Sequence, residues 1–466
     1  MRHTKIVCTI GPETCSLKAL RELAAGGMNV ARLNMSHGTH AWHREVMKNI
    51  RTLNEKGEYS VATMLDTKGP EVRSGDLKEP ITLRKGAPFT FTIRTDTANA
   101  SDCASIGYDG FIEDVSVDDV ILVDGGLLSF QVMEKSATDV HCRCIDGGTL
   151  GSRRHINIRG KTATIPSMTE QDWQDIAFGM EENIDFYALS FVRDASTVTD
   201  LKKYLEEHDA SGSVIAKIES IAAIDHLDEI IDASDGAMVA RGDLGSEVAV
   251  EEVPLLQKRI VDLCRKQGKP VIVATHMLES MIEHPTPTRA EVTDVSYAIF
   301  QGTDAVMLSG ETASGKYPLK ALGVMDTIAR RMEEELKVSK APLAEKTNDP
   351  RHEITKSAAA IASNIGARAI VVFTRRGFMA SLVSMNRPHT DIFAFTNMSG
   401  VRRRLNLTWG VTSFRIEFSK DPEKTIQRAF SLLTERELLK AGDRIIVVSD
   451  ILAGEQLVET VQVRKI

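Results

Sequence analysis

Residues 214–220 read VIAKIES and residues 238–245 read MVARGDLG, and together they indicate the repeating unit from which the fold is built. Each segment is a short apolar run that ends abruptly in charged residues, which is typical of a buried strand reaching the edge of its sheet. Residues 222–231, between them, carry apolar side chains at helical spacing. A strand, a helix and a strand in this order run parallel in one sheet, so the stretch predicts an α/β fold.

Charged side chains end both of these strands. They are Lys217, Glu219, Arg241 and Asp243. Because the carboxyl ends of parallel strands face the ligand crevice, we expect the four side chains to share one mouth. Two carboxylates and two cations suit a divalent cation such as Mg²⁺ together with a phosphorylated substrate. Charged residues at strand ends are also common as solvated termini, and these four alone do not decide between the two interpretations.

The composition narrows the class of protein. At 466 residues, the chain is long enough for about three domains. Its net charge of -8 argues against a nucleic-acid partner and against an anionic membrane surface. We find no apolar run long enough to span a bilayer and no signal-peptide region at the start, so we expect no membrane association. Six cysteines without paired zinc spacing fit a reducing compartment, and we predict a cytoplasmic location.

The same strand and helix units recur along most of the chain. Predicted strands begin near residues 4, 29, 60, 184, 214, 236, 270 and 303, and each is followed by a helix. Eight such units are the count of a (β/α)8 TIM barrel.

Two further regions interrupt or follow the barrel. From 70 to 165 the sequence has short alternating runs, such as 89–93 and 120–130, with no convincing helix, which predicts an all-β lid domain inserted after strand 3. A segment at 338–353 resembles a linker, and the units then resume as a C-terminal α/β domain of about five strands. We therefore divide the chain into a barrel (1–69 and 166–345), a lid (70–165) and a C-terminal domain (346–466) with a regulatory or oligomerisation role.

Several stretches of the barrel are familiar as an ordered set. They are KIVCTIGP (5–12), ARLNMSHG (31–38), LDTKGPEVR (65–73), MVARGDLG (238–245), ATHMLESM (274–281), PTRAE (287–291) and MLSGETA (307–313). In order and spacing they resemble the pyruvate kinase family. The resemblance implies transfer of the phosphoryl group of phosphoenolpyruvate to ADP, giving pyruvate and ATP in the last step of glycolysis, with Mg²⁺ (or Mn²⁺) and K⁺ as cofactors.

The resemblance also implies the residues that act on the substrate. It assigns catalysis to Lys217, Arg32 and Thr275, and substrate binding to these three with Gly242 and Asp243. Lys217 would neutralise charge on the transferring phosphoryl group and on the enolate that remains. Arg32 would hold the phosphate with its planar fork of donors. Free N–H groups near Gly242 would bind the substrate carboxylate.

The same resemblance implies two cation sites. Glu219 and Asp243 would hold Mg²⁺. The ligands of K⁺ would be Asn34, Ser36, Asp66 and the carbonyl of Thr67. All of these are hard oxygen ligands, as such ions require. Family members that work without K⁺ carry a lysine at the position of Glu71, so we predict K⁺ dependence here.

For the nucleotide, ADP or ATP, the resemblance implies Asn34, His37, Arg73 and Arg154. Arginine replaces the family's usual lysine at Arg154, which keeps the charge and changes its geometry. Asp124, beside a glycine, is interpreted either as a further ligand contact or as ordinary turn chemistry. The expected partners are thus phosphoenolpyruvate and the nucleotide, with a homotetramer implied by resemblance only.

The C-terminal domain departs from the family pattern. Members regulated by sugar phosphates have a loop rich in hydroxyl groups, and here residues 374–380 read TRRGFMA. No effector is therefore transferred to this chain.

Two other functions compete with the kinase interpretation. A barrel aldolase or lyase acting on a related enolate would use similar charged residues but would need neither Arg73 and His37 nor a lid. A non-catalytic sensor of nucleotides or metabolites would have no physical need for the complete set of charged residues. Dependence of the reaction on the nucleotide discriminates among these possibilities.

Overall fold

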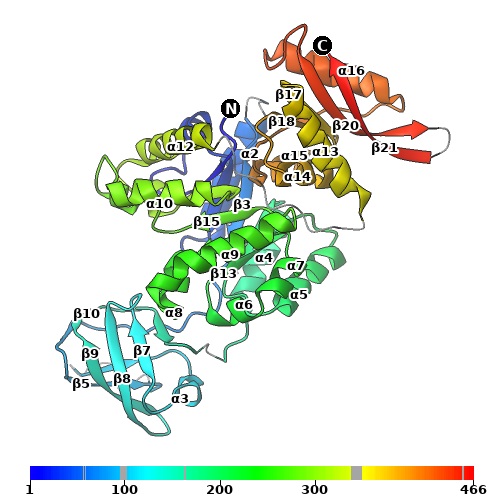
Figure 1. The fold of residues 1–466 in the computed structure, drawn as a ribbon. Helices are drawn as coiled ribbons and strands as arrows, with labels where there is room; N and C mark the ends of the chain where they lie inside the picture. Colours follow the sequence, from blue (N-terminus) through cyan, green and yellow to red (C-terminus); the bar gives the residue numbers. More distant parts are fainter. Residues whose placement is uncertain (56, 58, 95–101, 162–163, 337–348, 454–455) are drawn as a thin grey trace.

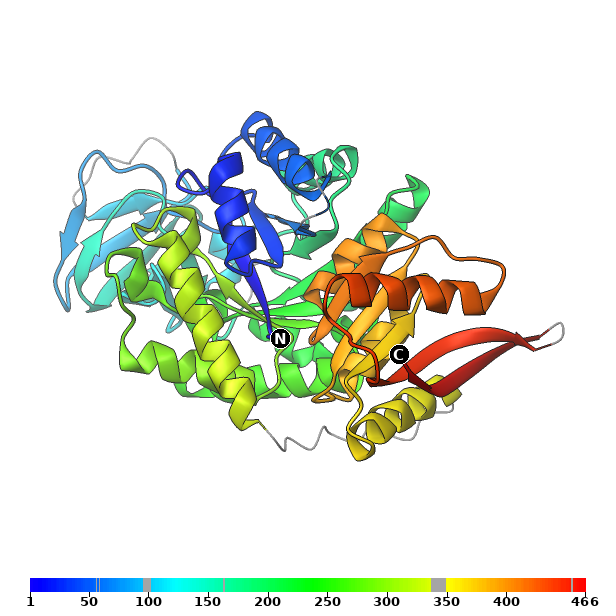
Figure 2. The same ribbon diagram turned by 90° about the horizontal axis from the view of Figure 1, so that it is seen from above.

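The computed structural model describes residues 1–55, 57, 59–94, 102–161, 164–336, 349–453 and 456–466. It forms three bodies: a barrel, a small β domain at one end of the barrel, and an α/β domain at the other (Figure 1). In the orthogonal view the three bodies keep this order (Figure 2).

Eight parallel strands close the central barrel. They are β1 (Lys5–Thr9), β2 (Val30–Asn34), β3 (Ala62–Asp66), β12 (Phe186–Leu189), β13 (Ser213–Ile218), β14 (Gly236–Ala240), β15 (Val271–Ala274) and β16 (Ala305–Leu308). Nearly every residue of these strands is buried, which explains why they read as continuous apolar runs rather than alternating ones. All eight predicted strands and the barrel itself are confirmed.

Helices surround the barrel. They are α1 (Leu17–Ala25), α2 (His40–Glu55), α4 (Glu170–Glu181), α5 (Ala195–Glu207), α6 (Ile221–Asp225), α7 (Leu227–Ala233), α8 (Arg241–Glu247), η1 (Val250–Glu252), α9 (Val253–Lys266), η2 (Glu279–Ile282), α10 (Arg289–Phe300), α11 (Gly310–Ala313) and α12 (Pro318–Glu335). Reciprocal capping boxes at Thr169 and Thr288 start α4 and α10. The single helix predicted over 222–231 is wrong, because the structure breaks it into α6 and α7 at His226.

The inserted domain is a twisted β structure, as predicted. One sheet has the order β11-β7-β8-β9-β5-β6, and β4 pairs with β10. Its elements are β4 (Ile81–Leu83), β5 (Pro88–Thr92), β6 (Cys103–Ser105), β7 (Val120–Val123), β8 (Leu128–Lys135), β9 (Asp139–Asp146), β10 (Gly148–Leu150), β11 (Ile156–Ile158) and the helix α3 (Phe111–Asp114). The prediction that residues 70–165 contain no helix is therefore wrong, because the short helix α3 lies among the strands.

The run at 120–130 is a hairpin rather than one strand. Asp124, Gly125 and Gly126 have φ values of 55°, 67° and 88°, and they turn the chain between β7 and β8. Glycine adopts such angles without steric cost. The turn interpretation of Asp124 is confirmed, and its contact with a ligand stays a prediction.

The C-terminal domain has a five-stranded sheet in the order β19-β18-β17-β20-β21. Its elements are α13 (Pro350–Asn364), β17 (Ala369–Phe373), α14 (Phe378–Met385), β18 (Asp391–Thr396), α15 (Ser399–Arg404), η3 (Leu405–Leu407), β19 (Val411–Arg415), α16 (Pro422–Glu435), β20 (Arg444–Ala453) and β21 (Gln456–Lys465). The predicted linker at 338–353 falls mostly outside the described residues, and its last part is wrong because α13 already begins at Pro350. The domain limits near 69, 165 and 345 stay predictions.

One side chain of the C-terminal domain enters the barrel. Leu407 of η3 is fully buried and packs with the inward-facing residues of the barrel, among them Phe186, Ile215 and Met307. Beside it, Arg403 forms an ion pair of 2.9 Å with Asp185, which precedes β12. The C-terminal domain thus closes the barrel at the amino ends of its strands and leaves the carboxyl ends to the lid.

No helix in the described part of the chain is both long and apolar enough to cross a membrane.

We predict that Leu407→Ala lowers the free energy of unfolding by about 3 kcal/mol, because it opens a cavity inside the barrel. Thermal or denaturant unfolding of the whole chain measures this change. Leu319→Ala is the control, since Leu319 is 43% exposed and its truncation should cost less than about 0.5 kcal/mol. Equal losses for the two variants would show that Leu407 does not seal the barrel.

Candidate active site

A buried carboxylate lies at the centre of the barrel mouth. Asp66, at the end of β3, is 1% exposed. Its Oδ2 accepts a hydrogen bond of 2.6 Å from Arg32 Nε on β2, and its Oδ1 lies 3.0 Å from Lys217 Nζ on β13. Burial alone would raise the pKa of Asp66, but the charges of Arg32 and Lys217 hold it below its ordinary value. Asp66 therefore stays ionised and brings the two cations together.

Lys217 is held in place on three sides. Its ammonium donates to Ser190 Oγ at 2.6 Å and lies 3.4 Å from Glu219 Oε2. Burial acts to lower the pKa of Lys217, but the nearby carboxylates of Asp66 and Glu219 outweigh it and raise the pKa. The lysine is therefore charged and pointed into the mouth.

Glu219 is buried with one oxygen free of hydrogen bonds. Its Oε1 accepts from the Phe191 N–H at 2.5 Å, whereas Oε2 is buried with no hydrogen-bond partner among the residues that the structure describes. Burial, and next to it the charge of Asp243, raise the pKa of Glu219 to about 8, although Lys217 opposes this rise. The nearest cation to Oε2 is the Lys217 ammonium at 3.4 Å, and a bound metal ion would supply a closer partner.

The first turn of α8 forms another part of the mouth. The Gly242 N–H donates to Thr275 Oγ1 at 2.8 Å. Thr275 and His276 have φ values of 68° and 53°, in the left-handed region that side chains with a Cβ rarely adopt. Backbone strain of this kind clusters at functional sites, where surrounding contacts hold it.

Arg241 does not join the charged cluster, contrary to the expectation that all four strand-end charges share the mouth. Its Nη1 donates to Asp294 of α10 at 2.6 Å and its Nη2 to the Thr275 carbonyl at 2.6 Å. The side chain therefore lies against β15 and α10. It braces the loop that carries Thr275.

The residues predicted for K⁺ lie close together on neighbouring strands. Asn34 of β2 pairs in register with Asp66 of β3, and Asn34 Oδ1 accepts from the Ser36 N–H at 3.2 Å. The carbonyl of Thr67 accepts a hydrogen bond of 2.6 Å from Ser190 Oγ. Their role as ligands stays a prediction.

Ser190 is one residue of the mouth that sequence reasoning missed. Its hydroxyl contacts both Lys217 and the Thr67 carbonyl, and it is 1% exposed. It follows β12 directly, so the rule that polar residues at strand ends face the mouth would have found it.

The residues predicted for the nucleotide come from both the barrel and the lid. Arg73 forms two hydrogen bonds with Glu71, of 2.7 and 2.9 Å, and Arg154 lies 3.2 Å from Asp124. An antiparallel β-bridge joins Arg73 to His155, and the Ser74 N–H donates to the Arg154 carbonyl at 2.8 Å. Arg73 and Arg154 therefore lie on adjacent segments. His155, which sequence reasoning also missed, is half-buried in the electrostatic field of Asp243, Glu71 and Asp124.

The lid is fastened directly to the barrel mouth. Asn157 of β11 donates to Glu247 of α8 at 3.0 Å, and the other carboxylate oxygen of Glu247 accepts from the Ile221 N–H at 3.2 Å. This contact joins the lid to the ends of β13 and β14.

These features define a class of protein. A (β/α)8 barrel presents buried cations and buried carboxylates at its mouth, beneath a β lid, which is the arrangement of an enzyme that stabilises developing negative charge on a phosphorylated substrate.

Comparison with known proteins narrows the class to a family. The model of the pyruvate kinase barrel domain matches residues 1–322, and that of the pyruvate kinase alpha/beta domain matches residues 352–463. The chain is 51% identical over its whole length to plastidial pyruvate kinase 2 of Arabidopsis thaliana, covering 81% of that protein. It is 42% identical to a pyruvate kinase of Geobacillus stearothermophilus, over 97% of this chain and 78% of that one. A crystal structure of a pyruvate kinase from Cryptosporidium parvum superimposes with a TM-score of 0.94 at 35% identity, covering 100% of this chain and 96% of that chain.

The chain belongs to the pyruvate kinase family, whose reaction transfers the phosphoryl group of phosphoenolpyruvate to ADP and yields pyruvate and ATP. Family membership excludes the aldolase or lyase interpretation.

Proposed function

We propose that the cluster around Lys217 is where this chain transfers the phosphoryl group. The observation that carries the proposal is the buried ammonium of Lys217, 3.0 Å from Asp66 and 3.4 Å from Glu219, next to the guanidinium of Arg32. Arg32 binds the phosphate as a fork of donors. Lys217 stabilises the charge on the phosphoryl group in flight and on the enolate oxygen that remains.

The start of α8 and the residue that follows β15 orient the substrate. The backbone N–H groups at Gly242 and Asp243, in the first turn of α8, bind the substrate carboxylate, and the Gly242 N–H would exchange its present bond to Thr275 Oγ1 for the substrate. Thr275, whose hydroxyl already accepts from Gly242, contacts the same carboxylate and lies on the path of the proton that converts the enolate to pyruvate.

Glu219 and Asp243 fit a divalent cation, Mg²⁺ or Mn²⁺. The observation that supports this is the buried Oε2 of Glu219, which lacks a hydrogen-bond partner in the described structure. The described residues contain no group of three or more His, Cys, Asp or Glu side chains suited to a metal, and Mg²⁺ typically takes only one or two protein carboxylates. When bound, the cation would polarise the oxygens of the substrate.

The remaining ligands follow the same proposal. We infer that K⁺ is held by Asn34, Ser36, Asp66 and the carbonyl of Thr67, all oxygen donors at the ends of β2 and β3. The nucleotide is held by Asn34, His37, Arg73 and Arg154. Two of these come from the barrel and two from the lid, so binding of ADP would join the two domains.

Assembly and location are proposals of the same kind. We propose a homotetramer on the basis of family membership. The cytoplasmic location stays a prediction, since one relative named above is plastidial and another is bacterial, and both are members of the family.

We predict that Lys217→Met lowers kcat by about 100- to 1,000-fold, because it removes charge that the transition state needs. Release of pyruvate from phosphoenolpyruvate measures this, with ADP, Mg²⁺ and K⁺ each omitted in turn. Lys203→Met is the matched control, since Lys203 is 73% exposed and lies on the outer helix α5, paired with Glu207. Each omission should abolish activity, and pyruvate released equally well without ADP would refute phosphoryl transfer to the nucleotide.

Cation binding should release a proton from Glu219. With its pKa raised to about 8, the carboxyl group is protonated at lower pH and must ionise to bind a cation. Affinity for Mn²⁺ should therefore rise with pH, by about tenfold per unit below pH 8, and level off above it. Calorimetry in buffers of different ionisation enthalpy counts the protons. Glu219→Gln should bind Mn²⁺ weakly and release none, and proton release equal to that of the wild type would exclude Glu219 as the source.

Replacement of K⁺ by Na⁺ or tetramethylammonium, at saturating Mg²⁺, should reduce the velocity severely. The reason is that this chain has Glu71 at the position where family members that work without K⁺ carry a lysine, whose ammonium replaces the ion. Glu71 forms an ion pair with Arg73. Full activity without K⁺ would contradict the predicted site.

A further inference from the structure

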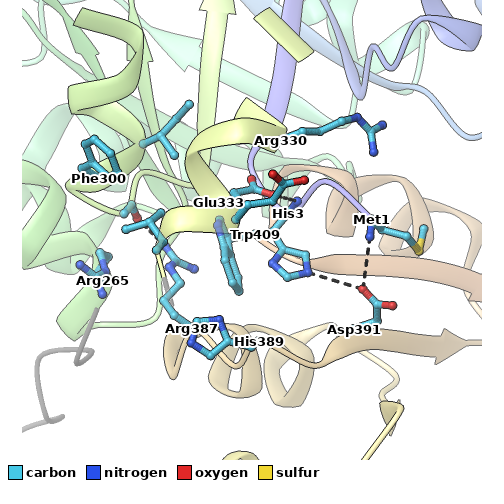
Figure 3. Close-up of a pocket in the computed structure, with 14 residues that line it drawn as sticks. Met1, His3, Arg265, Phe300, Arg330, Glu333, Arg387, His389, Asp391 and Trp409 are labelled. Atoms are coloured by element: carbon cyan, nitrogen blue, oxygen red, sulfur yellow. Dashed lines mark hydrogen bonds and ion pairs between the residues drawn. The ribbon is translucent and has the colours of Figure 1, made fainter. Parts of the chain in front are cut away.

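A cavity of about 410 Å³ lies between the barrel and the C-terminal domain. Its walls include the ends of α9, α10 and α12 and residues 387–391, with Trp409 between them (Figure 3). The helices of the barrel end at the amino ends of the strands, so this cavity lies at the opposite end from the mouth. It also lies apart from the loop at residues 374–380, none of which lines it.

Arg265, on one wall, is a buried arginine without an acidic partner. It is 6% exposed, and its Nη1 donates to the Gln301 carbonyl at 3.0 Å. Its Nε has no hydrogen-bond partner, and within the described ranges no carboxylate forms an ion pair with it. Burial, together with the nearby charge of Arg387, lowers the pKa of Arg265 to about 10, which still leaves it charged at neutral pH.

Arg387 places a second charge beside the first. Its Nη1 and Nη2 lie 3.1 and 2.9 Å from the two oxygens of Asp304, and Nη2 also donates to the Gly302 carbonyl at 2.9 Å. Its side chain is 8% exposed and packs over the ring of Trp409. Arg265 and Arg387 therefore both approach the carbonyl end of α10, at Gln301 and Gly302.

The charges in this corner do not balance. Among the described residues, the one carboxylate at hydrogen-bond distance from these two buried guanidinium groups is that of Asp304, which pairs with Arg387, and Arg265 has only the carbonyl of Gln301, at the end of α10. A buried charge without a partner is unfavourable, and a bound anion would remove that cost.

The opposite wall limits the kind of anion. Glu333 accepts from the N–H groups of His3 and Thr4, and Asp391 pairs with His3 and with Arg368. These carboxylates are already satisfied, and they would repel a second anionic group at the far end of a ligand. The volume exceeds that of a bare inorganic ion and lies in the usual range for small metabolites.

We propose that this cavity binds a small metabolite with one oxyanion group, a phosphate monoester or a carboxylate, whose oxygens accept hydrogen bonds from Arg265. His389, which also lines the cavity, lies beside Arg387 (Figure 3). The proposal is independent of the phosphoryl-transfer site and goes beyond it.

Binding there would act on the junction of the two domains. Asp304 directly precedes β16, and besides Arg387 it accepts from the Trp409 N–H at 3.1 Å and the Val271 N–H at 3.2 Å. An anion that draws Arg387 toward itself would weaken its pair with Asp304, and hence a contact between the barrel and the C-terminal domain.

The test compares the wild-type chain with Arg265→Gln in thermal unfolding at constant ionic strength. The probes are glycerol 3-phosphate, inorganic phosphate and chloride. Glycerol 3-phosphate should raise the Tm of the wild type. Its apparent dissociation constant for Arg265→Gln should be at least about tenfold higher than for the wild type. Arg259→Gln, on the same helix with a half-exposed side chain paired to Asp228, should behave as the wild type. Binding of the probe at the barrel mouth is common to all three proteins and cancels.

Each other outcome overturns the proposal. Equal Tm shifts in the wild type and in Arg265→Gln would show that Arg265 binds no anion. A shift with inorganic phosphate but not with the ester would indicate an inorganic ion only. If Arg265 merely caps α10, the variant will lose stability without any probe, whereas removal of an unbalanced charge should leave its unliganded Tm unchanged or higher. If Arg265→Gln does not fold, Arg265→Lys replaces it in the test, because lysine keeps the charge but lacks the planar fork of guanidinium donors. Unchanged binding of glycerol 3-phosphate to Arg265→Lys would show that this fork does not hold the anion.

Discussion

The active end of the barrel depends on one buried carboxylate. Asp66 is shared between Arg32 and Lys217. In the described structure it is the only carboxylate that pairs with Arg32, and Lys217 has one further and longer contact, with Glu219. Without Asp66 the two charges would repel each other in a region of low dielectric constant, at a cost of about 3–5 kcal/mol. Since the three residues lie on β2, β3 and β13, the pairing also requires the closed barrel that places those strand ends around one centre.

The two ends of the barrel are used for different purposes. Leu407 fills the end where the strands begin, so the C-terminal domain contributes to the core of the barrel rather than only packing beside it. The other end stays available to ligands, and the lid is joined to it through Asn157 and Glu247. Separation of these ends allows the carboxyl ends to carry strained backbone, as at Thr275, while the opposite end supplies the packing that holds it.

The balance of charge distinguishes the two sites. At the mouth, Arg32 and Lys217 face Asp66 and Glu219, and one oxygen of Glu219, which has no hydrogen bond in the described structure, remains for a metal cation. On one wall of the cavity beside the C-terminal domain, Arg265 has no ion-pair partner among the described residues and Arg387 pairs with Asp304, whereas Glu333 and Asp391 on the opposite wall are already engaged by other groups. The first site is therefore suited to a cation with its anionic substrate, and the second to an anion alone.

The barrel was predictable from the sequence because its signals are local. Apolar runs that end in charge mark each strand, helical spacing marks each helix, and together they determined the eight units, the lid and the strand-end positions of Lys217, Glu219 and Asp243. Contacts between distant residues carry no such local signal. Only the tertiary structure turned Arg241 away toward Asp294, placed Ser190 between Lys217 and Thr67, and brought Arg265 next to Arg387. In each case the direction of a side chain depends on which partner the folded chain places within its reach, and that is decided by packing rather than by the neighbouring sequence.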